Sequence, residues 1–155
     1  MRAFFDSNVF VYALDNDDPV RQGVAQRLLA QHSSGGHALV LSIQVLLETY
    51  NVLTRKKRAP PSVALAAVRM LMEHEVVAPN TTAALQALEL AVRHGVSPWD
   101  SLIVQAALDA GCDTLFSEDL QSGRRFGALQ VVNPFLLAAH EPTDGGVAAP
   151  SPRRQ

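Results

Sequence analysis

The sequence predicts an α/β fold, a three-layer α/β/α sandwich around a mainly parallel sheet of four or five strands. Short apolar runs bounded by turn residues alternate along the chain with longer segments whose apolar residues recur at helical spacing. Strands separated by helices favour βαβ units, in which the strands are parallel and the helices cover both faces of the sheet. The chain has 155 residues, of which 48% are hydrophobic and 18% charged, and this suits a single compact domain.

The first half of the chain contains two predicted strands, at residues 3–5 and 38–41, and three predicted helices, one starting at Pro19 and two over residues 43–54 and 62–74. The first strand is an apolar run that ends at Asp6. The helix at Pro19 follows Asp18, a suitable N-cap, and proline favours the first helical position. A break at Pro60 separates the other two helices.

The second half contains two predicted helices, over residues 81–93 and 97–111, and two predicted strands, at residues 114–117 and 131–132. Gly95 is a suitable stop between the helices. Residues 1–140 are expected to form the one domain. Residues 141–155 contain three prolines, two glycines and no aromatic residue, which predicts a disordered C-terminal tail.

Charge and cysteine content narrow the class of protein. Fifteen acidic and thirteen basic residues give a net charge of −2, which by itself argues against a nucleic-acid partner, since such proteins are usually basic. The lone Cys112 cannot form an internal disulfide or a multi-cysteine zinc site, so we expect a reducing, cytoplasmic location. No apolar run approaches the length of about 20 residues that a membrane span needs, and Asp6 comes too early for a signal peptide.

Four carboxylates are candidates for a functional site: Asp6, Glu48, Asp100 and Asp119. In open parallel sheets ligands bind beyond the carboxyl ends of the strands, where Asp6 and Asp119 follow predicted strands and Asp100 opens the helix before one of them. Glu48 lies in a narrow polar stripe of its helix.

Each of these acids also has an ordinary structural explanation. Asp100 could complete a capping box with Ser97, and Glu48 could face solvent. Asp6 and Asp119 could serve turns.

The four acids together predict a bound cation. Carboxylates within about 5 Å of one another repel by roughly 3 kcal/mol per pair at an effective dielectric constant near 20. No histidine or cysteine accompanies them at ligand spacing, and a site with oxygen ligands alone selects Mg²⁺ or Mn²⁺. Cations held in this way suit phosphodiester hydrolysis.

Other phosphate chemistries are disfavoured. An aspartyl phosphotransferase would need an acid where Asn8 stands, and a receiver domain would need a lysine near the last strands, far from Lys56 and Lys57. A Gly-rich phosphate loop is absent from the sequence.

Four segments resemble, in order, the motifs of PIN domains: DSNVFVY from Asp6, QVLLETY around Glu48, WDSLI around Asp100 and LFSEDL around Asp119. The resemblance extends from Arg2 to about Phe135, and the subgroup it points to is the VapC-type toxins of toxin–antitoxin pairs. Pro98 departs from the pattern, because many relatives carry an aromatic residue there, but it is compatible with a first helical turn.

The resemblance implies an endoribonuclease that depends on Mg²⁺ or Mn²⁺, forms a homodimer and is inhibited by a small antitoxin. Asp6 and Asp100 would be the principal metal ligands, and Glu48 and Asp119 would complete the acidic site. Asn8 and Ser117 match positions that support the site through hydrogen bonds. Glu118 would face either a second metal or solvent.

An RNA substrate also needs positive charge near the acids. Arg124 and Arg125 follow Asp119 closely and are the favoured phosphate contacts. Arg55 and Lys56 begin the only dense basic run, which could equally be a solvated helix end. The alternative function is a non-catalytic RNA- or protein-binding module whose acidic residues are vestigial.

Overall fold

The structure, a computed structural model, describes residues 1–136, in which six strands and six helices alternate. Their bounds are β1 Arg2–Phe5, α1 Ser7–Leu14, α2 Pro19–Ser33, β2 Ala38–Ser42, α3 Ile43–Arg55, α4 Pro61–Leu71, β3 Glu75–Val77, α5 Thr81–His94, α6 Pro98–Asp109, β4 Thr114–Phe116, β5 Arg125–Phe126 and β6 Leu129–Val132. The predicted domain boundary at residue 140 and the predicted tail lie outside the described residues.

One sheet has the strand order β3-β2-β1-β4-β6-β5. All neighbouring strands are parallel except β5, which runs antiparallel to β6. The chain adds strands on one side of β1 as far as β3 and then crosses to the other side to form β4. This reversal next to β1 is a topological switch point, the position at which open α/β sheets bind ligands.

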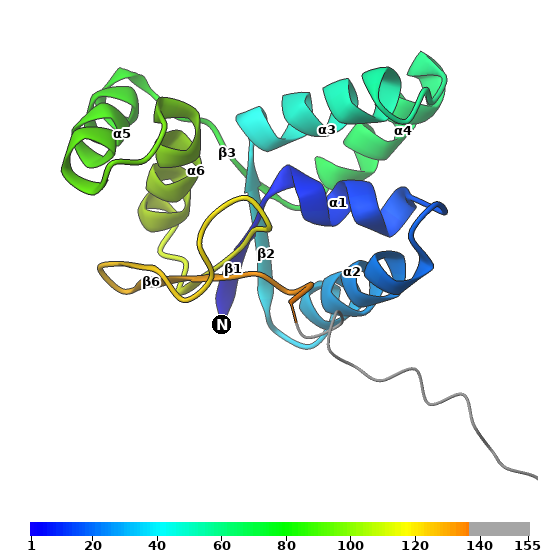
Figure 1. The fold of residues 1–155 in the computed structure, drawn as a ribbon, viewed down its shortest axis with the longest axis horizontal. Helices are drawn as coiled ribbons and strands as arrows, with labels where there is room; N and C mark the ends of the chain where they lie inside the picture. Colours follow the sequence, from blue (N-terminus) through cyan, green and yellow to red (C-terminus); the bar gives the residue numbers. More distant parts are fainter. Residues whose placement is uncertain (137–155) are drawn as a thin grey trace, which may run out of the picture.

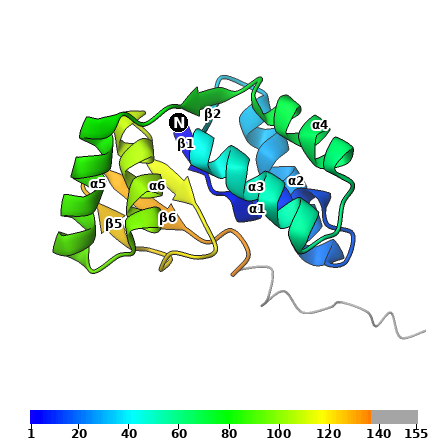
Figure 2. The same cartoon turned by 90° about the horizontal axis from the view of Figure 1, so that it is seen from above.

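Helices cover both faces of the sheet. Figure 1 shows α5 and α6 on one side of β1 and β2, with α1, α2, α3 and α4 on the other, and Figure 2 shows the same division from above. Strand β1 is buried on both faces, since Phe4 and Phe5 point to opposite sides and neither is exposed to solvent. None of the described helices combines the length and the hydropathy that a membrane crossing requires.

The predicted α/β class and three-layer arrangement are confirmed, but the sheet has six strands rather than four or five. The two strands that the sequence did not reveal are β3 and β5, which form the edges of the sheet. They have three and two residues, and each includes an exposed charged residue, Glu75 or Arg125, so neither has the apolar run that marks a buried strand. The predicted helix over residues 62–74 accordingly ends early, at Leu71.

Candidate active site

Asp6 stands at the switch point, directly after β1, and is the N-cap of α1. Its backbone N–H donates to the carbonyl of Phe116, which places it beside the end of β4. Its carboxylate accepts two hydrogen bonds, from the backbone N–H of Ser7 at 2.8 Å and from the hydroxyl of Ser117 at 2.7 Å. The residue is only 4% exposed, so both carboxylate oxygens are fixed from within the fold.

Burial makes Asp6 difficult to ionise. The pKa of Asp6 is raised from 3.8 to about 6, mainly by desolvation. The nearby charges of Glu48 and Asp119 add to this rise, and the hydrogen bonds from Ser117 and Ser7 oppose it. Within residues 1–136, no lysine, arginine or histidine forms an ion pair with any of the four predicted site carboxylates.

Glu48 is connected to Asp6 through Ser7. The Ser7 hydroxyl donates to Glu48 Oε2 at 3.3 Å, while the backbone of the same serine donates to Asp6. Gln44, one helical turn before Glu48, donates to Glu48 Oε1 at 2.8 Å. Ser7 and Gln44 are therefore site residues that the sequence analysis did not select, although Gln44 shares the polar stripe of Glu48.

Asp100 lies in the first turn of α6 and is brought toward Glu48 by the same glutamine. Gln44 Nε2 also donates to the carbonyl of Trp99 at 3.1 Å. The backbone N–H of Asp100 donates to the hydroxyl of Ser97, the N-cap of α6, at 3.1 Å. The reverse bond of a capping box is not formed, and within the described chain the carboxylate of Asp100 accepts no hydrogen bond.

Asp119 and Glu118 follow β4 in a loop that Asn8 holds against α1. Asn8 uses both ends of its amide, donating to Asp119 Oδ2 and accepting from the backbone of Glu118, each at 3.3 Å. The backbone of Asp119 donates to Ser117 Oγ at 3.2 Å. A chain of hydrogen bonds thus joins Asp119, Asp6 and Glu48 through two serines.

A pocket of about 270 Å³ opens beside these residues. Its lining comes from α1, the C-terminal end of α3 and the two residues after it, and the loop after β4. It consists of Ser7, Asn8, Val11, Tyr12, Val52, Lys56, Lys57, Glu118 and Asp119. Lys56 therefore lines the same pocket as Glu118 and Asp119, while its exposed neighbour Arg55 is not part of the lining.

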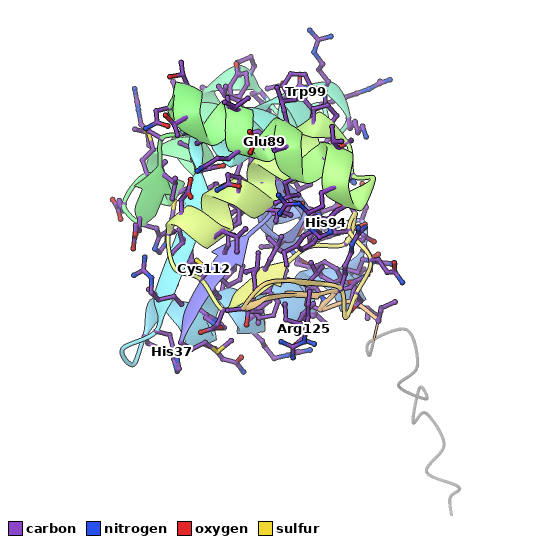
Figure 3. All side chains as sticks on the ribbon, turned by 90° about the vertical axis from the view of Figure 1, so that its left-hand side faces the viewer. His37, Glu89, His94, Trp99, Cys112 and Arg125 are labelled. Carbon is purple, nitrogen blue, oxygen red and sulfur yellow. The ribbon has the colours of Figure 1, made fainter. Side chains whose placement is uncertain are left out.

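The other two basic candidates make contacts elsewhere in the fold. Arg124 donates to the carbonyl of His94 at the end of α5 and packs over the ring of Phe126. Arg125, in edge strand β5, donates to Gln130 at 3.3 Å. In Figure 3 it lies toward the opposite end of the molecule from Trp99, the neighbour of Asp100. Phosphate contacts by these two arginines stay a prediction.

The chemistry of the donor set fits Mg²⁺ or Mn²⁺, because the four acids supply only oxygen ligands and none of them forms an ion pair with a basic residue of the described chain. In the part of the chain that is described, no three Asp, Glu, His or Cys side chains are gathered closely enough to hold a metal ion.

Comparison with known proteins identifies the family. The family model described as PIN domain matches residues 3–125, a span that includes all four carboxylates. The chain belongs to the PIN domain family. This confirms the resemblance inferred from the four motifs. No curated protein matches the chain.

Solved structures share the fold of this PIN domain. Mycobacterium tuberculosis VapC20, described as a sarcin-ricin loop cleaving toxin, is 28% identical, with a TM-score of 0.62 over 76% of this chain and 91% of its own. VapBC-1 from nontypeable Haemophilus influenzae is 19% identical, with a TM-score of 0.60 over 86% and 98% of the two chains. VapBC2 from Rickettsia felis, bound to a promoter DNA fragment, is 18% identical, with a TM-score of 0.59 over 84% and 97%.

Proposed function

We propose that this PIN domain is a metal-dependent endoribonuclease and the toxin of a toxin–antitoxin pair. The observation that carries the proposal is the buried carboxylate of Asp6, which has other carboxylates around it and no cation from the described chain. The family match and the likeness to VapC20, a toxin that cleaves the sarcin-ricin loop, support RNA as the substrate.

Asp6 and Asp100 would hold Mg²⁺ or Mn²⁺, and Glu48 and Asp119 would complete the site. A divalent cation held by carboxylates polarises phosphoryl oxygens and lowers the pKa of water toward neutrality. The chain itself positions the acids: Ser7 and Ser117 fix the two oxygens of Asp6, Asn8 holds Asp119, and Gln44 ties Glu48 to the start of α6.

Substrate phosphates need a positive side chain near the acids. Lys56 meets this requirement, because it lines the pocket that Asp119 and Ser7 also line. Arg55 precedes it at the end of α3 and extends the positive charge along the surface.

The proposal includes two protein partners, an antitoxin and a second copy of the chain. A structure of the same fold from Klebsiella pneumoniae, 16% identical with a TM-score of 0.62, is a toxin-antitoxin complex, which supports the first partner.

RNA cleavage by purified variants tests the proposal. Asp6→Asn and Asp100→Asn should each reduce kcat by about a hundredfold or more, the size of effect seen when a principal charge-stabilising group is lost. Asp17→Asn makes the same charge change at an exposed position and should cleave like the wild type. Circular dichroism checks that each variant is folded. Cleavage of structured RNA by Asp6→Asn at the wild-type rate would refute the assignment.

A further inference from the structure

Glu118 lines the same pocket as Asp119, but its carboxylate contacts Tyr12 and Arg21 and not the groups that hold the proposed site carboxylates. Its neighbours Ser117 and Asp119 are bonded to Asp6 and Asn8. The side chain of Glu118 instead accepts a hydrogen bond from the hydroxyl of Tyr12 at 3.3 Å, and the same oxygen lies 3.6 Å from Nε of Arg21. The carboxylate of Glu118 is therefore held by one residue of α1 and one of α2.

Arg21 reaches this position from the first turns of α2. Its Nη1 pairs with Asp18 at 3.0 Å, and its guanidinium carbon lies 5.5 Å from the centre of the Tyr12 ring. Its Nε is buried and makes no hydrogen bond to another described residue, so the charge of Glu118 is what faces it. A buried N–H without a hydrogen-bond partner lowers the stability of the fold. The attraction between Nε of Arg21 and Glu118 offsets part of this cost.

Tyr12 is fixed from two directions. It follows Asn8 by four residues and so lies on the same face of α1, the face turned to the loop after β4. The ring of Phe135 packs against it edge-on, with ring centres 4.8 Å apart. Figure 1 shows α1 and α2 side by side, and Glu118 is the point where both contact the loop that carries Asp119.

We propose that Arg21, Tyr12 and Glu118 form a clamp that fixes the loop carrying Asp119, so that Glu118 is a positioning residue and not a metal ligand. The inference rests on the proposed function in one respect, because Asp119 is taken to serve the metal site. The clamp holds Glu118 while Asn8 holds Asp119, and the two attachments together leave the loop little freedom to turn Asp119 outward.

A positioning role and a purely electrostatic role predict opposite effects of Arg21→Ala on cation binding. If charge alone mattered, Arg21→Ala would remove a positive charge near the site and bind cations more tightly, while Glu118→Gln would bind them more weakly. A clamp predicts weaker binding in both variants. Tyr12→Phe changes no charge, so any effect of this variant reports on the loss of the hydroxyl contact.

The first measurement is the dissociation constant for Mn²⁺ by calorimetry, without RNA. Arg21→Ala, Glu118→Gln and Tyr12→Phe should each weaken binding by up to about tenfold, the lower end of the range for residues that orient ligands. Arg27→Ala, on the same helix and exposed, makes the same charge change as Arg21→Ala and should bind like the wild type. Unchanged or tighter binding in Arg21→Ala overturns the clamp.

The second measurement is amide hydrogen exchange of residues 117–121, which needs no metal. Exchange should be faster in Arg21→Ala and Tyr12→Phe than in the wild type and in Arg27→Ala; exchange at the wild-type rate overturns the clamp. If the wild type binds no Mn²⁺, the proposed function is refuted, and the clamp is then tested by amide hydrogen exchange alone. Arg21→Ala also loses the ion pair with Asp18. If that variant does not fold, Mn²⁺ binding and hydrogen exchange of Tyr12→Phe test the clamp.

Discussion

Asp6 is the residue at which folding stability and the proposed chemistry oppose each other. The end of β1 buries its carboxylate beside Ser117, in surroundings that favour the neutral form. A metal ligand has to be ionised at neutral pH, so the fold bears a cost at this position that a bound cation would offset. Buried acids kept in this way are typical of functional sites.

The pH dependence of stability should reveal this cost. Between about pH 4 and pH 6 the unfolded chain has lost the Asp6 proton while the folded chain keeps it, since the folded pKa is about 6, so stability falls as the pH rises through this window. Above pH 6 the free energy of unfolding is lower by about 3 kcal/mol than it would be if the pKa of Asp6 were unshifted.

Asp6→Asn cannot ionise and should therefore be more stable than the wild type at pH 7.5 by up to about 3 kcal/mol, without the decline between pH 4 and pH 6. Urea unfolding across this pH range measures both effects, with Asp17→Asn as the control for charge. An Asp6→Asn variant that is less stable than the wild type at pH 7.5 would contradict the raised pKa of Asp6 in the folded chain.

At the scale of helices and strands, the N-terminus of α6 fixes the backbone position of Asp100. Gly95 ends α5 in the left-handed conformation, with φ of 65°, which a residue without a Cβ adopts readily. Ser97 then caps α6 through the N–H of Asp100 itself. The cap therefore has two tasks, to stabilise the helix and to hold the backbone of a proposed ligand.

Two cap variants separate these tasks. Ser97→Ala and Asn80→Ala each remove an N-cap side chain, from α6 and α5, and each should lower the free energy of unfolding by about 1 kcal/mol. Only Ser97→Ala should also weaken Mn²⁺ binding, because α5 carries none of the proposed ligands. Calorimetry on the two folded variants makes the comparison, and equal Mn²⁺ affinities would show that the cap does not position Asp100.

At the scale of the whole molecule, the charge balance has a local origin. Setting aside the four site carboxylates leaves eleven acidic and thirteen basic residues, a net charge of +2. The overall value of −2, which by itself argues against a nucleic-acid partner, is thus compatible with the proposed RNA substrate, since the excess of acid lies in the proposed site.

Mn²⁺ should raise the melting temperature of the whole domain. A ligand specific to the native state stabilises it by about 2.7 kcal/mol at a concentration one hundred times its dissociation constant, which shifts Tm by roughly 5–10 °C in a domain of this size. Differential scanning calorimetry should show the shift in the wild type and its absence in Asp6→Asn. A wild-type Tm that does not respond to Mn²⁺ would favour the non-catalytic binding module.

The order of helices and strands, and with it the fold class, follows from local features of the sequence. Helical spacing and caps mark α2 to α6, and apolar runs mark the buried central strands, but the short helix α1 was not predicted. The edge strands β3 and β5 each include an exposed charged residue and lack such a run, and β3 pairs with a strand more than 30 residues away. Four ordered motifs also sufficed to indicate the PIN domain family.

The sequence by itself determined which carboxylates are candidates for the site, and the tertiary structure decided their surroundings. Periodicity gives the face of a helix on which a side chain lies, but not what stands opposite. Parallel pairing of β1 with β4, more than 100 residues apart, places Ser117 on Asp6. Glu118 contacts Tyr12 of α1 and Arg21 of α2 in the folded chain. The sequence alone predicted that this residue faces either a second metal or solvent. Such contacts join residues far apart in the chain, so no local pattern encodes them.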